Sequence, residues 1–322
     1  MPVPSPEELA EFIDDPLAHK LASQARIYWR KKRRNRNLLT VLFVIFIPAT
    51  CATTLWFGTD GAGANFEPMA AAGVPFAMAL LFGVVYAALW VRLVAEELPF
   101  EYEPDMVAPV VHFIDPRIAY RPKNGLAQSD FEKSQFIPEE VGEFSSRRCF
   151  DGSIRSLKLR FGQLEASSAR RRGWRKKPDF SFRGLFAVAQ FERGFPGYTA
   201  IYPTGDQQWT WWDPAVAPDG AQALELNLSG LAAISTDPEA ASELLTPPVV
   251  DRLNTLQEAF SDDASTTESP AFCLVLSNDG CFFAHPHRAY FERPASLAIK
   301  DTAHLHRVGR QISALVGVIE LL

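Results

Sequence analysis

Cysteine is scarce in this chain, and its positions form no recognisable pattern. The 4 cysteines are Cys51, Cys149, Cys273 and Cys281, and no two of them stand in a C-x-x-C pair. Disulfide scaffolds and zinc sites both need sets of closely spaced cysteines. The sequence therefore excludes a disulfide framework and offers no cysteine-based zinc motif.

Motifs for common catalytic and cofactor chemistry are also missing. The chain has no G-x-S-x-G, H-E-x-x-H, P-loop or EF-hand pattern. Gly58, Gly61 and Gly63 do not join a strand to a helix, so they form no dinucleotide fingerprint. We expect no cofactor and no catalytic residue set, which favours a protein other than an enzyme. An active site assembled from dispersed polar residues stays open, because such sites are recognised by geometry.

An overall excess of positive charge is lacking as well. The net charge is -6 and the sequence pI is about 5.6. This balance argues against a nucleic acid as the main partner. A chain of 322 residues is long enough for a membrane segment and one sizeable soluble domain.

Two long runs carry no charge at all, residues 38–57 and residues 69–91. A helix of such length spans about 30 Å, the thickness of the hydrocarbon core of a bilayer. The runs therefore predict a transmembrane hairpin over residues 38–95, with a polar external loop at 58–68. Burial in a protein core is the alternative interpretation.

The basic run before the first apolar segment sets the expected orientation. It includes Arg30, Lys31, Lys32, Arg33 and Arg34, whereas the loop between the apolar runs contains no lysine or arginine. The positive-inside rule predicts a multi-pass protein of the bacterial inner (plasma) membrane with both termini in the cytoplasm. The same cations are candidates for contact with anionic lipid headgroups of the bilayer.

Residues 1–37 are expected to form a cytoplasmic helical arm. Ser5 and Glu8 make a capping box with Pro6 at the first helical position, and a second helix is expected from Pro16 through the basic run into the first apolar segment. The arm could lie on a membrane or pack on the soluble domain.

Residues 96–322 are expected to form a cytoplasmic α+β domain, with a mixed, mainly antiparallel sheet and packed helices. Asp279-Gly280 predicts a hairpin, and helices are expected after Thr246-Pro247 and at the C-terminus. The hairpin register should keep Cys273 and Cys281 apart. The strand-like runs are Ala108–Ile114, Ser156–Phe161, Gly184–Phe191, Tyr198–Tyr202, Gln222–Leu228 and Ala271–Leu276.

Three groups of residues together form a pattern in the soluble part of the chain. They are Phe131–Ser134 with Phe150–Gly152 and Leu157–Phe161; Phe182–Phe186 with Phe191, Phe195, Gly197, Thr199 and Pro203; and Ser235–Ala240 with Leu244–Pro247. As a set they resemble a bacterial membrane-protein family known as domain of unknown function 3137. The resemblance covers residues from Phe131 to the C-terminus, the predicted hairpin suits the family too, and it implies an architecture but no activity. The chain departs from the family pattern at Ala241-Ser242-Glu243, where the family has Arg-Tyr.

Two H-x-H pairs are the weak candidates for a metal site. His285 and His287 share a face if they lie on a strand, and could then supply two imidazoles. His304 and His306 fall in a helical pattern, where residues two apart diverge. Hydrogen-bonded structural histidines are the alternative.

Two further segments are candidates for contact with a protein partner or a lipid surface. One is a basic stretch with a tryptophan, and the other ends in tryptophans that could be exposed. A solvated loop and a strand end closing the core are the alternatives. The candidates are Arg170, Arg171, Arg172, Trp174, Arg175, Lys176, Lys177, Trp209, Trp211 and Trp212.

Together these features predict a membrane-anchored cytoplasmic interaction or scaffold module, such as a subunit of a membrane assembly. A protein partner or a homo-oligomer is expected. The alternative is an enzyme or small-ligand sensor, for which the histidine pairs are the first residues to test.

Overall fold

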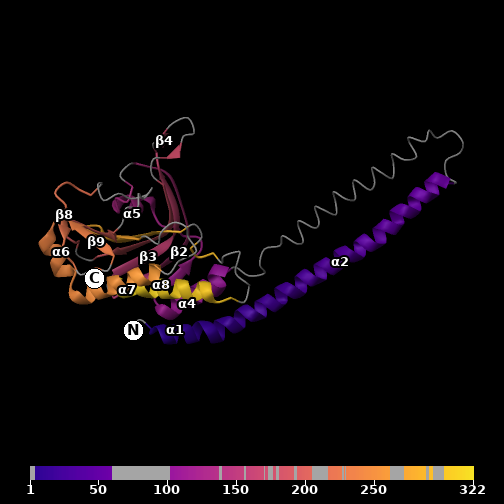
Figure 1. The fold of residues 1–322 in the computed structure, drawn as a ribbon, viewed down its shortest axis with the longest axis horizontal. Coiled ribbons are helices and arrows are strands. Elements are labelled where there is room, and N and C mark those ends of the chain that lie inside the picture. The colour runs from indigo at the N-terminus through magenta and orange to yellow at the C-terminus, as the bar shows by residue number, and fades with distance from the viewer. Residues whose placement is uncertain are drawn as a thin grey trace. The chain divides into compact units, whose positions relative to one another are not determined.

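The computed structural model describes the chain in two compact units. Unit 1 comprises Met1–His19 and Tyr102–Leu322, and unit 2 comprises Lys20–Glu101. Both units are drawn in Figure 1. The residues described are 4–59, 102–137, 140–155, 157–169, 171–172, 177–178, 181–191, 194–204, 217–226, 228, 230–261, 272–287, 290–292 and 301–322.

In the described part of unit 1, a 9-stranded antiparallel sheet has the order β1-β2-β3-β6-β11-β10-β7-β9-β8. Together with the surrounding helices, the sheet confirms the predicted α+β class. Its strands are β1 (Ala119–Arg121), β2 (Val141–Ile154), β3 (Leu157–Ser168), β6 (Ser181–Gln190), β7 (Tyr198–Pro203), β8 (Gln222–Leu224), β9 (Leu231–Ser235), β10 (Cys273–Ser277) and β11 (Gly280–Pro286).

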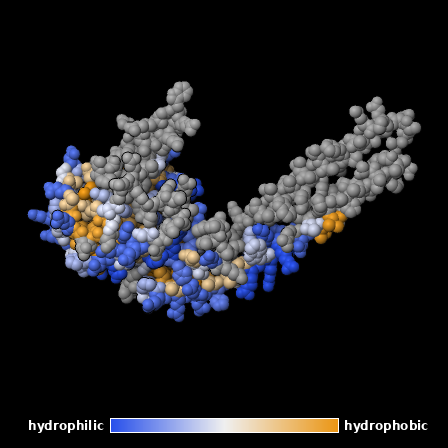
Figure 2. All heavy atoms as spheres, viewed as in Figure 1, coloured by the Kyte–Doolittle hydropathy of each residue, from blue (hydrophilic) through white to orange (hydrophobic). Residues whose placement is uncertain are grey.

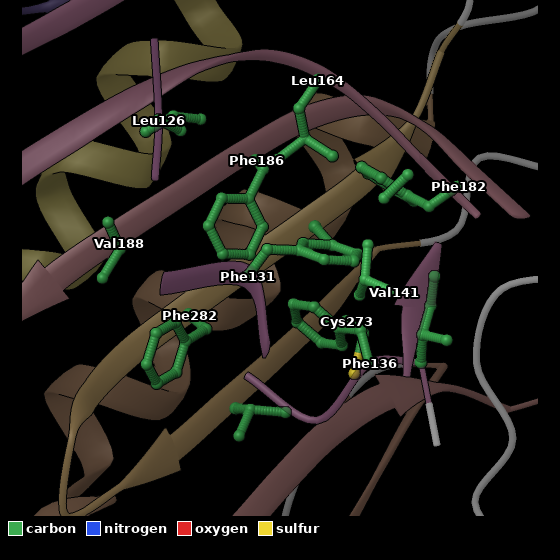
Figure 3. Close-up of a cluster of buried hydrophobic side chains, with 14 of the residues drawn as sticks. Leu126, Phe131, Phe136, Val141, Leu164, Phe182, Phe186, Val188, Cys273 and Phe282 are labelled. Atoms are coloured by element: carbon green, nitrogen blue, oxygen red, sulfur yellow. The ribbon is translucent and has the colours of Figure 1, made fainter. Parts of the chain in front are cut away.

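One face of the sheet packs on helix α5 (Gln128–Lys133) and the segment that follows it. Phe131 of α5 meets Phe186 of β6 with ring centroids 5.3 Å apart, and Phe136 meets the same ring edge-on. Figure 3 shows these aromatic side chains together with Phe282 of β11. Alternation along the strands sends Phe186 and Phe282 to this face and their neighbours to the other.

The opposite face carries helices α7 (Pro247–Ser261) and α8 (Ala303–Ile319), which lie along the sheet in Figure 1. Phe260 of α7 packs on Phe283 of β11, with ring centroids 5.2 Å apart. Helix α6 (Pro238–Leu244) precedes α7 and is capped by the Asp237 side chain. The predicted helices after Thr246-Pro247 and at the C-terminus are therefore confirmed.

The N-terminal arm is part of unit 1 and contains α1 (Pro6–Phe12) and a π-helical turn, η1 (Ile13–Leu17). The predicted Ser5–Glu8 capping box is present. Phe12 stacks on Phe113 with ring centroids 4.2 Å apart. A Cβ atom at Gly309 would lie 3.1 Å from side-chain carbons of Leu9 and Val110, so a glycine permits this close approach.

One expectation for unit 1 was wrong, and one strand was missed. Ala108–Ile114, predicted as a strand, is helix α4, which continues the π-helical turn η2 (Glu103–Val107). Its valines and isoleucine favour strands, but packing against α8 and the N-terminal arm decides the outcome. Strand β2 was not predicted, because it mixes exposed and buried residues without a clean alternation. The Asp279-Gly280 hairpin is confirmed, and Cys273 pairs with Ala284 rather than with Cys281.

Helix α2 (Ala18–Thr59) has 42 residues, and its part from Lys20 onward is the described part of unit 2. As predicted, one helix runs through the basic segment into the first apolar run. Most side chains of residues 38–57, and all of residues 69–91, lie outside what the structure describes.

The predicted transmembrane hairpin requires a correction. In the residues that the structure describes, no helix is both long and apolar enough to cross a membrane. This finding goes against the predicted multi-pass location in a bacterial inner membrane.

Candidate functional site

The first histidine pair lies where β11 ends, on the sheet face covered by α7 and α8. The His285 side chain is buried and meets the Phe260 ring edge-on, with centroids 4.6 Å apart. The His285 and His287 rings lie 6.3 Å apart. Tyr290 stands beside both, at 6.1 Å from His285 and 5.8 Å from His287. The pair thus belongs to an aromatic and imidazole cluster.

His304 of α8 joins this cluster through two hydrogen bonds. Its Nε2 atom lies 3.0 Å from the Tyr290 carbonyl oxygen, which can only accept, so Nε2 carries the proton. The Nδ1 atom of the same ring lies 3.2 Å from the Tyr102 hydroxyl, which forms the second hydrogen bond. Both nitrogens of this buried ring are therefore used for structure.

Arg307 connects the first histidine pair to α8. Its Nη1 atom lies 3.3 Å from Nε2 of His287. A guanidinium only donates, so this contact uses the acceptor lone pair of a neutral His287 ring. His304, Arg307 and Gln311 recur at spacings of three and four and so share one side of α8. Sequence reasoning missed this polar stripe, because it treated the two H-x-H pairs separately.

The cluster does not have the composition of a metal centre. Within the described residues, no group of three or more His, Cys, Asp or Glu side chains could hold a metal ion. The bonds of His304 occupy both of its nitrogens, and the Arg307 guanidinium places a positive charge beside His287. A cation there opposes the approach of a metal ion.

His306 points to a different part of unit 1, as the helical spacing predicts. Its Nε2 atom lies 2.7 Å from Oδ1 of Asp14 in the N-terminal arm. Thr302 donates to the same oxygen at 3.4 Å. Asp14 precedes unit 2 in the chain and Tyr102 follows it directly. His306 and His304 therefore fasten to α8 the two segments between which unit 2 is inserted.

Arg148 makes a second polar junction at a β-bulge in β2. Its backbone has a φ of 58°, and the pairing with β3 shifts register between Arg147 and Phe150. The guanidinium binds Glu103 at 2.9 Å and Glu292 at 2.6 Å. No local signal marks this residue in the sequence, since Glu292 lies 144 residues away.

The described thiols are buried and unsuited to nucleophilic chemistry. Burial raises the pKa of Cys149 to about 11 and that of Cys281 to about 12. Burial also raises the pKa of Cys273 well above the usual value of 9.0. A thiol attacks as a thiolate, so these groups are inert near neutral pH.

The basic segment of α2 forms the second candidate site, which belongs to unit 2 alone. Ile27 and Trp29 are 54% and 55% exposed, respectively. Lys32 lies 5.5 Å from the ring centroids of both Tyr28 and Trp29 and donates to the Tyr28 hydroxyl at 3.4 Å. Figure 2 shows the hydrophilic segment in blue, followed along the helix by a hydrophobic group in orange. The exposed cations include Arg26, Arg30, Lys31, Arg33 and Arg34.

Most of the other predicted contact residues cannot be placed. Arg171–Arg172 and Lys177–Pro178 pair as strands β4 and β5 of a small ribbon rather than a loop. Their side chains lie outside what the structure describes. The following residues also lie outside the described part: Arg170, Trp174, Arg175, Lys176, Trp209, Trp211 and Trp212.

Comparisons with known proteins give little further information. No protein-family model matches the chain, so the family resemblance stays a prediction. No curated protein matches it either. One solved structure, the mycobacterial trehalose monomycolate transport factor A, TtfA, is 9% identical over 63% of this chain and 88% of its own. The TM-score of 0.34 is too low for this likeness to support a conclusion.

Proposed function

We propose that the chain is a non-catalytic interaction module whose α2 helix binds an acidic protein partner, while unit 1 serves as its folded base. The observation that carries this proposal is the exposed basic and aromatic surface of α2. Trp and Arg are the residue types that contribute most at protein interfaces. An exposed tryptophan among arginines therefore favours a binding surface.

The charge of α2 supports an acidic partner. No Asp or Glu occurs anywhere from Ala18 to Thr59. Like charges four residues apart, such as Arg30 and Arg34, destabilise a helix by about 0.2–0.5 kcal/mol per pair. The helix itself provides no carboxylate to offset this repulsion, whereas carboxylates of a partner would relieve it and guide its approach.

The alternative is an enzyme or small-ligand sensor built on the histidine cluster. The hydrogen bonds of His304 and the position of Arg307 beside His287 favour a structural role for these groups. Native mass spectrometry of the protein and of a His285→Ala, His287→Ala variant tests this alternative. A small molecule retained by the natural chain and lost from the variant would support it.

The interaction proposal is tested by purification of the full chain from its native cells, with mass spectrometry of stoichiometric companions. The test variant is Arg30→Ala, Arg33→Ala, Arg34→Ala. The matched control removes three exposed cations of unit 1 through Lys123→Ala, Arg147→Ala, Lys158→Ala. We expect a companion protein that is lost only with the α2 variant. A companion kept by both variants, or none at all, would overturn the proposal.

A further inference from the structure

Exposed side chains lie on every face of the described part of α2. One set of them, starting at Ile27, recurs at alternating spacings of three and four, the spacing of the a and d positions of a coiled coil. Among the residues that the structure describes, Ile27, Val41 and Val44 are 54%, 56% and 60% exposed, so these positions of the stripe are open to solvent. The stripe, which we call the α2 stripe, comprises Ile27, Arg30, Arg34, Asn37, Val41 and Val44.

The same register explains the cations beside the α2 stripe. Arg26 and Arg33 fall at g positions and Lys31 at an e position, the places that set partner choice in coiled coils. Lys32 falls at the outer f position, where it is engaged with Tyr28 and Trp29 instead. The e and g positions up to Arg33 therefore present positive charge beside the α2 stripe, which itself mixes apolar and polar residues.

We infer that the partner docks as an acidic helix, with carboxylates at its e and g positions and apolar side chains facing Ile27, Val41 and Val44. This inference rests on the proposed function and adds the shape and chemistry of the partner. A second copy of α2 in parallel orientation is disfavoured, because the cations of the two helices would face one another with no acidic residue to offset them.

The first test uses the full chain and synthetic helical peptides of four heptads, with binding measured by calorimetry. The first peptide has Leu at a and d and Glu at e and g. The second has Lys in place of Glu, and the third keeps Glu but has Ser at a and d. We expect binding of the Leu–Glu peptide at least about tenfold tighter than that of either of the others.

Charge reversal provides the matched test of register. The variant Arg26→Glu, Arg33→Glu should lose the Leu–Glu peptide and gain the Leu–Lys peptide. The control Arg147→Glu, Lys158→Glu carries the same charge change on unit 1 and should keep the original preference. Loss of the preference in both variants, or in neither, would overturn the inferred docking surface.

Three results would count against an acidic helix as the partner. Equal binding of the Ser–Glu peptide would show a diffuse polyanion site and overturn the helical partner. Tighter binding of a short DNA duplex, weakening steeply with salt, would point to nucleic acid instead. No binding of any peptide, when the native companion is still lost with the α2 variant, would sink the helical partner and leave the proposed function standing.

Discussion

His304 and His306 stand two residues apart on α8, and this spacing decides what each of them does. Residues two apart point in different directions from a helix. His304 is buried and binds Tyr102 and the Tyr290 backbone, whereas His306 is partly exposed and binds Asp14. The helical assignment and the absence of a shared face were predictable from sequence. The partners were not, since Tyr102 lies 202 residues from His304.

The burial difference gives a prediction for the two histidines. His304→Ala should lower the free energy of unfolding by about 2–4 kcal/mol, because it leaves a cavity and removes two buried hydrogen bonds. His306→Ala should cost less than about 1 kcal/mol, since the side-chain contact with Asp14 is exposed to solvent. Urea unfolding of both variants measures the difference. Equal losses would contradict the assignment of His304 as the buried connection.

The described cysteines give a second prediction at the residue scale. Because burial raises their pKa values, Cys149, Cys273 and Cys281 should not react with a thiol reagent at pH 8 in a Cys51→Ser variant. The Cys51→Ser change removes the fourth cysteine of the chain, so that only the three buried thiols can be labelled. All 3 remaining thiols should react once urea unfolds the chain. Rapid labelling of the folded variant, followed by peptide mapping, would identify any thiol that is accessible.

Helix α4 shows why a short helix can be mistaken for a strand. The run Ala108–Ile114 contains residues that favour strands, but its length also fits two helical turns. Contacts with α8 and the N-terminal arm select the helix. By contrast, α7, α8 and the β10–β11 hairpin carry local start signals or strong periodicity, so they were predicted correctly. The candidate site depends on contacts between residues that are far apart in the chain, and local sequence signals do not predict such contacts.

Asp115, at the C-terminal end of α4, gives a pH-dependent prediction. Burial raises its pKa, but hydrogen bonds from Arg117 outweigh burial and lower the pKa below 3.8. Stability from this pair is therefore present above the unfolded pKa and lost as the pH falls through the folded one. Asp115→Asn should be destabilising at pH 7, and this loss should shrink as the pH falls below 3.8. A constant loss in urea unfolding across this range would contradict the ion-pair contribution.

The β2 bulge gives a prediction about strain at Arg148. Arg148→Ala should lower the free energy of unfolding by about 2–3 kcal/mol, because it leaves Glu103 without its close cation. Arg148→Gly loses the same bonds but accepts the φ of 58° without strain, so it should be less destabilising by about 1 kcal/mol. Thermal unfolding of both variants tests this order. If glycine were the worse replacement, the positive φ would contribute no strain.

At the scale of the molecule, unit 1 consists of two separated stretches of the chain with unit 2 inserted between them. The sequence predicted an arm, a hairpin and a single C-terminal domain, because domain boundaries were placed where the amino-acid composition changes along the chain. It could not show that residues 4–19 belong with the domain, since that depends on distant contacts. The stacking of Phe12 on Phe113 and the hydrogen bond between Asp14 and His306 join these residues to the rest of unit 1.

This organisation predicts that unit 1 folds without unit 2. Replacing residues 20–101 by a flexible Gly/Ser linker of about twenty residues should keep the core protected in hydrogen exchange, because both flanking segments have their own contacts with α4 and α8. Deleting residues 4–19 as well should expose the α4–α8 surface around Gly309 and weaken protection of both helices. Loss of protection throughout the sheet in the linker variant would mean that unit 2 is required for the fold, and unit 1 would then be no independent base for α2.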